Sequence, residues 1–261
     1  MVNNDWEGKF GIVYDALVDL ILGRENGDDG WLDTADSSIY VDQGRGFGIN
    51  FLREPKHPRD VRNPHDVEFG LIFNYNNNSE DVRLHNVFID PDSQRGHIGG
   101  NILIHVAKTA LLLGCKRIFV KPTKMGSYYW PRHGAIILQW PPEIDQRFRN
   151  LIENRAHLAG WKEKDIEWLQ AVYDRKDPRQ LSVLATSDLK AGKIRVGEYI
   201  LRNIDLGSCI FDLNDDWTKQ RLREKLGFDV DVFRAGRGDA SIDRSMISGT
   251  KRRAAVKTAE S

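Results

Sequence analysis

The sequence predicts a mixed fold of the α/β or α+β class, with a mixed, mainly antiparallel sheet, one parallel strand-helix-strand unit and a mainly helical C-terminal extension. Three observations lead to this prediction. A strand pattern, a glycine-rich loop, a helical pattern and a second strand pattern follow one another between residues 84 and 120. Short strand candidates separated by turn residues precede this unit. Helical patterns then dominate the chain after two consecutive prolines at 141 and 142.

The segment before the parallel unit is expected to begin with a helix and continue as antiparallel strands. Apolar residues recur at helical spacing over residues 10–22, which end at Gly23. Residues 38–41 and 47–52 are strand candidates that flank the turn sequence DQGRG, so they should form a hairpin. Residues 67–75 and 84–89 are two further candidates, separated by a run of asparagines. Consecutive strands with such short connections are expected to pair antiparallel.

The parallel unit begins with a strand over residues 84–89, which stops before Asp90 and Pro91. The loop QRGHIGGN follows, with three glycines in five positions, and Asn101 can cap the next helix. A helical stripe over 101–113 ends at Gly114, and residues 116–120 read as a second strand. The loop should therefore lie at the carboxyl end of the first strand, where a helix N-terminus favours a phosphorylated cofactor.

Two cofactors are considered for this loop. A dinucleotide loop requires G-x-G-x-x-G, but His97 and Ile98 follow Gly96 and break the first glycine pair. No carboxylate that could bind a ribose is evident after the next strand. The dinucleotide interpretation is therefore disfavoured.

The stretch resembles the acyl-CoA loop of the GNAT N-acetyltransferase superfamily, in which Q/R-x-x-G-x-G/A opens a helix. Arg95 and Gly100 fill the first and last positions, whereas Ile98 stands where the family usually has glycine. An aromatic pair, a basic residue and a glycine often follow the next strand in this family. Here Tyr129, Trp130, Arg132 and Gly134 have that spacing. The resemblance covers about residues 37–140.

The resemblance implies transfer of an acetyl group from acetyl-CoA to an amine acceptor by direct attack. Backbone N–H groups of the loop would hold the pyrophosphate, and the strand before it would offer a donor to the thioester carbonyl. The implied cofactor-binding residues are Phe88, Ile89, Arg95, Gly96, His97, Ile98, Gly99, Gly100, Asn101 and Trp130.

The catalytic candidates are two tyrosines and two possible bases. Trp130 aligns with the family's frequent tyrosine acid and cannot donate a proton to a thiolate, so Tyr129 or Tyr128 is expected to replace it. His85 and Glu68 are candidate bases on adjacent predicted strands. A hydrogen-bonded strand histidine and a solvated glutamate are the alternative interpretations of these two residues.

The amino-acid composition of the chain restricts the kinds of partner that can be expected. The chain has 38 Lys and Arg against 38 Asp and Glu, so no overall charge favours nucleic acid or an anionic membrane. The longest apolar run, around residues 16–22, is too short to span a bilayer, and a cytoplasmic protein is expected. Two cysteines provide neither a disulfide framework nor a zinc quartet, and the histidine spacing predicts no metal. The expected partners are an acyl-CoA and an unidentified amine.

Three regions are expected. Residues 1–140 would form a GNAT-like acyl-CoA-binding core, 141–235 a mainly helical extension that could also complete the sheet, and 236–261 a disordered polar tail. Within the extension, residues 208–213 and 228–233 are strand candidates. Its helices are expected at 144–158, 162–173, 180–185, 196–201 and 215–226. Two functions stay open, an acetyl-CoA-dependent N-acyltransferase or a catalytically inactive GNAT-like binding or assembly module.

Overall fold

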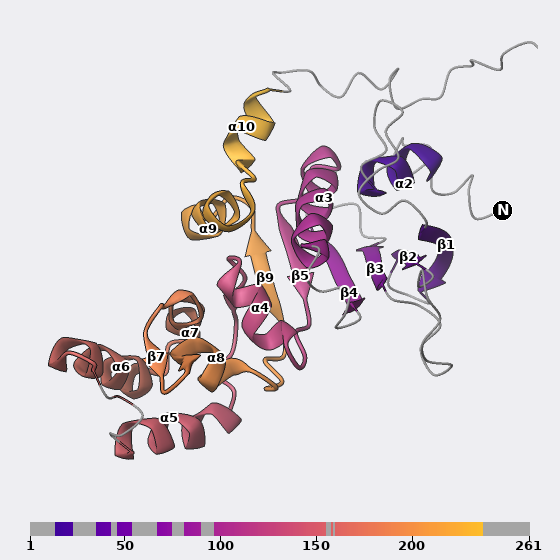
Figure 1. Ribbon diagram of the computed structural model, residues 1–261. Coiled ribbons are helices and arrows are strands. Elements are labelled where there is room, and N and C mark those ends of the chain that lie inside the picture. Colours follow the sequence, from indigo (N-terminus) through magenta and orange to yellow (C-terminus); the bar gives the residue numbers. More distant parts are fainter. Residues whose placement is uncertain are drawn as a thin grey trace, which may run out of the picture.

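The computed structural model describes residues 14–22, 35–42, 46–53, 67–74, 81–89, 97–154, 158 and 160–236. These residues form a mixed α/β fold built on a seven-stranded sheet with strand order β1-β2-β3-β4-β5-β9-β6 (Figure 1). Only β4 and β5 pair in parallel, and the other five pairings are antiparallel. The predicted mixed, mainly antiparallel sheet is therefore confirmed. None of the helices in the described ranges combines the length and the apolar composition that a membrane-spanning helix needs.

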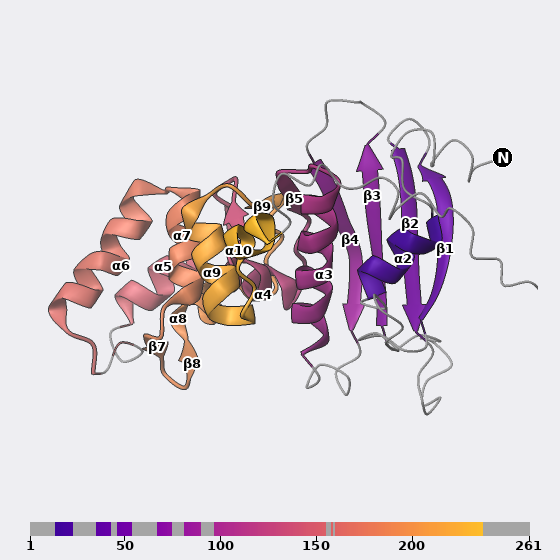
Figure 2. The same cartoon turned by 90° about the horizontal axis from the view of Figure 1, so that it is seen from above.

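The first four strands form an antiparallel meander, as predicted. Their bounds are Ala35–Asp42 (β1), Gly46–Arg53 (β2), Val67–Asn74 (β3) and Asp81–Ile89 (β4). Ile49, Leu71 and Leu84 lie opposite one another on β2, β3 and β4, and all three side chains are buried. Helices α2 (Tyr14–Leu22) and α3 (Ile98–Leu112) contact each other and lie on one side of the sheet (Figure 2). The alternation of apolar residues thus builds a core under these helices.

The crossover from β4 through α3 to β5 (Arg117–Val120) has the predicted parallel pairing. The helix, however, begins at Ile98, so the prediction that Asn101 caps it is wrong. His97 precedes the helix with a left-handed φ of 56°, and Gly99 and Gly100 lie inside the first turn. Both glycines are buried against other elements, and this tertiary packing overrides their weak helix propensity.

The extension supplies an internal strand of the sheet. After α4 (Gly126–Arg132) and β6 (Ile136–Ile137), the chain forms helices before returning as β9 (Cys209–Asp212). The helices are α5 (Glu143–Glu153), α6 (Glu163–Arg175), α7 (Pro178–Thr186) and α8 (Val196–Leu201), with the hairpin β7 (Lys190–Ala191) and β8 (Ile194–Arg195) before α8. Strand β9 pairs antiparallel with β5 on one side and β6 on the other. The predicted strand at 208–213 is confirmed.

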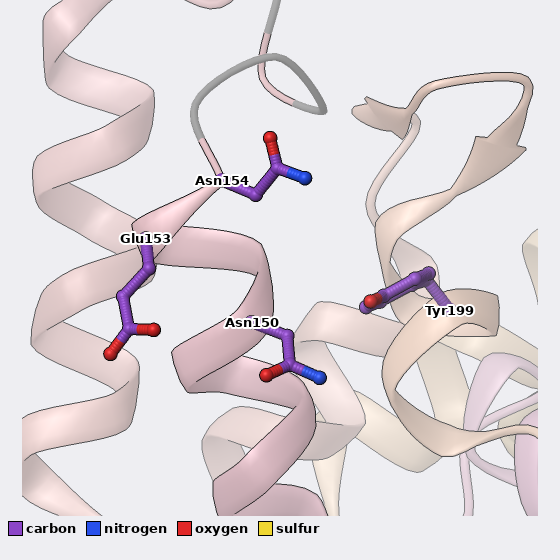
Figure 3. Close-up of a pocket in the computed structure, with 4 residues that line it drawn as sticks. All are labelled: Asn150, Glu153, Asn154 and Tyr199. Carbon is purple, nitrogen blue, oxygen red and sulfur yellow. The ribbon is translucent and has the colours of Figure 1, made fainter.

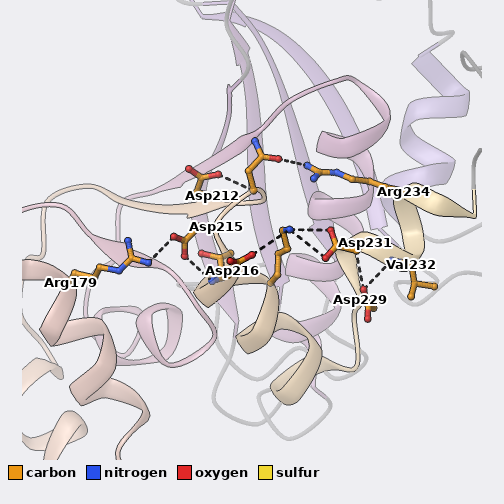
Figure 4. Close-up of polar contacts among 11 residues, drawn as sticks. Arg179, Asp212, Asp215, Asp216, Asp229, Asp231, Val232 and Arg234 are labelled. Carbon is orange, nitrogen blue, oxygen red and sulfur yellow. Dashed lines mark hydrogen bonds and ion pairs between the residues drawn. The ribbon is translucent and has the colours of Figure 1, made fainter. Parts of the chain in front are cut away.

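Two helices follow β9, α9 (Asp216–Leu226) and α10 (Val230–Ala235). The predicted strand over 228–233 is wrong, because the Asp229 carboxylate accepts hydrogen bonds from the N–H groups of Asp231 and Val232 and starts a helix there. Asp215 caps α9 through Thr218 N and also accepts a 2.7 Å hydrogen bond from Arg179 Nη2 of α7 (Figure 4).

Further polar contacts connect the two C-terminal helices to each other and to β9. Lys219 of α9 lies 3.1 Å from an Asp231 carboxylate oxygen of α10, and Arg234 Nη2 donates to Asn214 Oδ1 beside β9 (Figure 4). The tail from 237 to 261, predicted to be disordered, lies outside the described residues.

Candidate functional site

All four residues of β5 pair with the first four residues of β4. The ladder runs from Asp81–Arg117 to Leu84–Val120. Lys121 and Pro122 then follow β5, whereas β4 continues to Ile89 beyond the end of the ladder. Proline cannot donate to a ladder, so the end of β5 is fixed by sequence. Strand β4 therefore extends beyond β5 at the end of the sheet from which the chain leads to α3.

Strand β4 contains a bulge just past this point. Gly70 of β3 pairs with His85, whereas Glu68 pairs with Phe88, so residues 86 and 87 together face Phe69. An extra residue bends the strand and changes the direction of backbone groups, and such bulges are frequent next to active sites. The bulge lies where β4 has passed the end of β5.

Glu68 and His85, the predicted bases, project from the same face of the sheet. Glu68 lies two residues from Gly70, which is directly opposite His85. The His85 ring leans over Gly70, because a Cβ built on Gly70 would lie 2.5 Å from His85 Nε2 and 2.7 Å from Asn50 Oδ1. Glycine at position 70 thus lets two polar side chains approach each other.

Asn50 of β2 lies beside these two candidate bases and was not predicted from the sequence. Its Oδ1 is buried and has no hydrogen-bond partner among the described residues. An unsatisfied buried acceptor costs about 1–3 kcal/mol, so an N–H donor would be bound favourably beside it. The only sequence signal was a polar residue in a strand at the position that faces a glycine.

The start of α3 is covered by the Tyr129 side chain of α4. A Cβ on Gly99 would lie 3.0 Å from Tyr129 Oη and 3.4 Å from Ile89 Cδ1, and one on Gly100 would lie 3.8 Å from Tyr129 Oη. The glycine pair therefore lets the phenol approach the first helical turn. N–H groups of this turn have no acceptor within the helix and carry partial positive charge.

The two tyrosine candidates differ in environment. Burial raises the pKa of Tyr129 to about 12, so its hydroxyl keeps its proton near neutral pH. The Tyr129 Oη makes no hydrogen bond to any residue in the described part of the chain. Tyr128 is buried, and its hydroxyl accepts a hydrogen bond from Arg132 Nη1. Tyr129 is therefore the phenol positioned at the start of α3.

His133 was also missed by the sequence analysis. Its ring stacks on Tyr129 with centroids 4.1 Å apart, and its Nδ1 lies 2.8 Å from the Tyr129 carbonyl oxygen. Burial, together with the charges of Arg132, Lys225 and Arg221, lowers the pKa of His133 to about 4, against the raising effect of the hydrogen bond to the Tyr129 carbonyl. His133 is therefore neutral near pH 7 and holds the ring of Tyr129 in place.

The other residues predicted to bind the cofactor differ in how deeply they are buried. Phe88 and Ile89 are half-buried at the end of β4, His97 is exposed, Ile98 is buried and Asn101 is half-buried. Trp130 is buried and packs edge-on against Phe211 of β9 at 6.2 Å between ring centroids. Arg95 and Gly96 lie outside the described residues.

A pocket of about 480 Å³ lies elsewhere, between α5 and α8 (Figure 3). Asn150, Glu153 and Asn154 line one side and Tyr199 the other, and none of the predicted site residues contributes to it. Asn150, Glu153 and Asn154 are exposed. In the described part of the chain no group of three or more His, Cys, Asp or Glu residues could hold a metal ion.

Comparisons of the chain with protein-family models, curated proteins and solved structures find no match.

Proposed function

We propose that the protein is an N-acyltransferase that moves an acetyl group from acetyl-CoA to an amine. The observation that carries the proposal is that β4 extends beyond its parallel neighbour β5 beside the glycine start of α3. An antiparallel meander followed by one parallel crossover is also the arrangement expected from the resemblance to the GNAT superfamily. A pyrophosphate at the first turn of α3 would direct the thioester towards the part of β4 that extends beyond β5.

The β4 bulge is the proposed site of the thioester carbonyl. A backbone N–H near Phe88 would donate to the carbonyl oxygen, and this hydrogen bond would strengthen as negative charge develops on that oxygen. The lone pair of the amine attacks the carbonyl carbon, a C–N bond forms and the C–S bond breaks. One amine proton passes to a base, His85 or Glu68, and the products are an amide and CoA.

Tyr129 is the proposed donor to the leaving sulfur. A pKa of about 12 lies above that of an ordinary thiol, about 8.5, so full proton transfer from the phenol to the thiolate is uphill. The hydroxyl instead stabilises the developing thiolate by a hydrogen bond, and solvent supplies the proton that completes the CoA thiol.

The alternative is a catalytically inactive GNAT-like module. It is favoured by Trp130, which stands at the position of the family's tyrosine and packs in the core against Phe211. An inactive module would bind CoA without releasing thiol from acetyl-CoA.

The test is to incubate the full-length protein with acetyl-CoA and a panel of amines, free amino acids and lysine peptides. Thiol release and the mass of the acylated product report turnover, and calorimetry with CoA reports binding. Tyr129→Phe should lower turnover by about 10²-fold with little change in CoA affinity, whereas Tyr128→Phe should retain most activity. The proposal fails if wild-type protein does not bind CoA. Full turnover in Tyr129→Phe would exclude the role of the phenol.

A further inference from the structure

Three cations converge on the site from two distant parts of the chain. Arg132 ends α4, whereas Arg221 lies in the middle of α9 and Lys225 lies one turn further on, near the end of that helix. Arg132 directly precedes His133, and a Cβ built on Gly134, the residue after His133, would lie 3.0 Å from Arg221 Cβ. The charges of all three residues lower the pKa of His133. We name Arg132, Arg221 and Lys225 the basic cluster.

The basic cluster has more donors than the described residues satisfy. Arg221 Nη1 pairs with Glu224 at 2.6 Å, yet its Nε is buried without a hydrogen-bond acceptor among the described residues. Trp217 Nε1, whose ring lies 5.1 Å from the Arg221 guanidinium carbon, is a second buried donor of this kind. Three cations against one carboxylate leave an excess of positive charge here, which favours an anionic ligand.

The basic cluster adjoins the start of α3. A Cβ on Gly100 would lie 2.9 Å from Cδ2 of Leu226, the residue after Lys225. On the other side, His133 stacks on Tyr129, whose hydroxyl lies against Gly99. The end of α9 therefore borders the turn to which the pyrophosphate is assigned.

Basic residues at the end of a helix also have a simpler role, since cations there stabilise the helix dipole. Arg223 serves that purpose on α9, and it pairs with Asp229 at 2.6 Å. Lys225 is exposed and forms no ion pair with a residue that the structure describes. Arg221 is only 12% exposed, a burial that dipole stabilisation does not require. Arg223 and Lys225 thus provide a matched pair of cations with different surroundings.

We propose that the basic cluster binds the 3′-phosphate of the CoA nucleotide. The inference rests on the proposed function, which assigns the pyrophosphate to α3 and leaves the 3′-phosphate as the remaining anion of the donor. It identifies the acyl donor as the complete CoA thioester, in preference to the same acyl group on dephospho-CoA or pantetheine.

The test is calorimetry of CoA and dephospho-CoA with the full-length protein and three variants. Lys225→Gln and Arg221→Gln should each weaken CoA binding by about 10-fold or more, the value of a lost charge-assisted hydrogen bond. The same variants should bind dephospho-CoA as wild type does. Arg223→Gln is the control, because it removes the same charge from α9 and should leave both affinities unchanged. Lys225 is exposed, so its variant should fold even if Arg221→Gln does not.

Two results would overturn the inference while the proposed function stands. In one, Lys225→Gln binds CoA as tightly as Arg223→Gln does. In the other, Lys225→Gln weakens CoA and dephospho-CoA equally. If wild-type protein binds neither compound, the proposed function fails, and adenosine 3′,5′-bisphosphate then tests the basic cluster alone. Binding that Lys225→Gln abolishes would support the phosphate site, and no binding would reject it.

Discussion

His133 should make the protein sensitive to mild acid. Burial and the neighbouring cations lower the pKa of its ring from 6.5 to about 4. In the unfolded chain the imidazole takes up a proton near its ordinary pKa, whereas in the folded protein it stays neutral until about pH 4. The unfolded state therefore binds more protons between these values. The contribution of His133 to stability is complete above pH 6.5 and is lost as the pH falls towards 4.

The size of the effect follows from the two pKa values. Linkage gives a loss in the free energy of unfolding of about 2 kcal/mol at pH 5 and about 3 kcal/mol at pH 4. His105 on α3 has a pKa that burial, and to a lesser degree Lys108, also lowers to about 4, so it should contribute a second loss of similar size. At about 2–4 °C per kcal/mol, His133 alone should lower the melting temperature at pH 5 by about 4–8 °C.

Urea unfolding at pH 7, 6 and 5 separates the two histidines. His133→Gln cannot titrate in this range, so it should lose about 2 kcal/mol less than wild type between pH 7 and 5. His105→Gln should behave alike, and the double variant should show the sum, because the two residues lie on different helices. The wild-type ring should also titrate near pH 4 by NMR. If the pH profiles of wild type and His133→Gln run parallel, or the ring titrates near 6.5, the described burial of His133 is wrong.

Two further predictions concern packing and the Tyr129 phenol. Gly197→Ala should lower the free energy of unfolding by about 3 kcal/mol, because its Cβ would lie 2.5 Å from Leu184 O and 2.6 Å from Ala185 Cα, backbone atoms that cannot move alone. Gly100→Ala is the control, since only the flexible tip of Leu226 is that near, and equal stability of the two variants would contradict the close approach of α7 and α8. The raised pKa of Tyr129 predicts stability that is complete below pH 10 and lost as the pH rises towards 12, by about 1.4 kcal/mol at pH 11. Urea unfolding at pH 9 and 11 should show this loss in wild type but not in Tyr129→Phe, and an equal loss in both would place the phenol in solvent.

Sequence patterns within single segments were enough to predict the strands of the meander and the ends of the crossover. Alternating apolar residues identified the meander, and proline and glycine marked the ends of the crossover. The errors arose where a short polar contact or a distant neighbour decides the structure. Asp229 converts an apolar stretch into α10 by capping it, and the packing of Gly99 and Gly100 allows α3 to begin before Asn101. The spacing of apolar residues alone predicts neither the Asp229 cap nor the packing of the two glycines.

The candidate site was predictable to a similar extent. The glycine loop and the tyrosines stood out because their spacing resembles that of a known family. His133 and Asn50 did not, because a lone histidine or a strand asparagine has no distinguishing pattern before its neighbours are known. The meeting of Arg132 with Arg221 and Lys225 joins residues about ninety positions apart in the chain, so it depends on the sheet that brings α4 and α9 together.

The insertion of β9 between β5 and β6 explains how the extension reaches the side of the molecule where α3 begins. Because β9 pairs with both neighbours, the chain that follows it must leave the sheet beside β5, and α9 starts four residues after β9 ends. Thr218 of α9 then donates a 2.9 Å hydrogen bond to the carbonyl of Gly134, just past α4, which fixes α9 against the end of that helix. The pairing of β9 and the buried hydrogen bond from Thr218 to Gly134 thus position Arg221 and Lys225 relative to Tyr129 and His133. A substitution that displaces β9 should therefore alter the surroundings of Tyr129 more than those of β1 to β3.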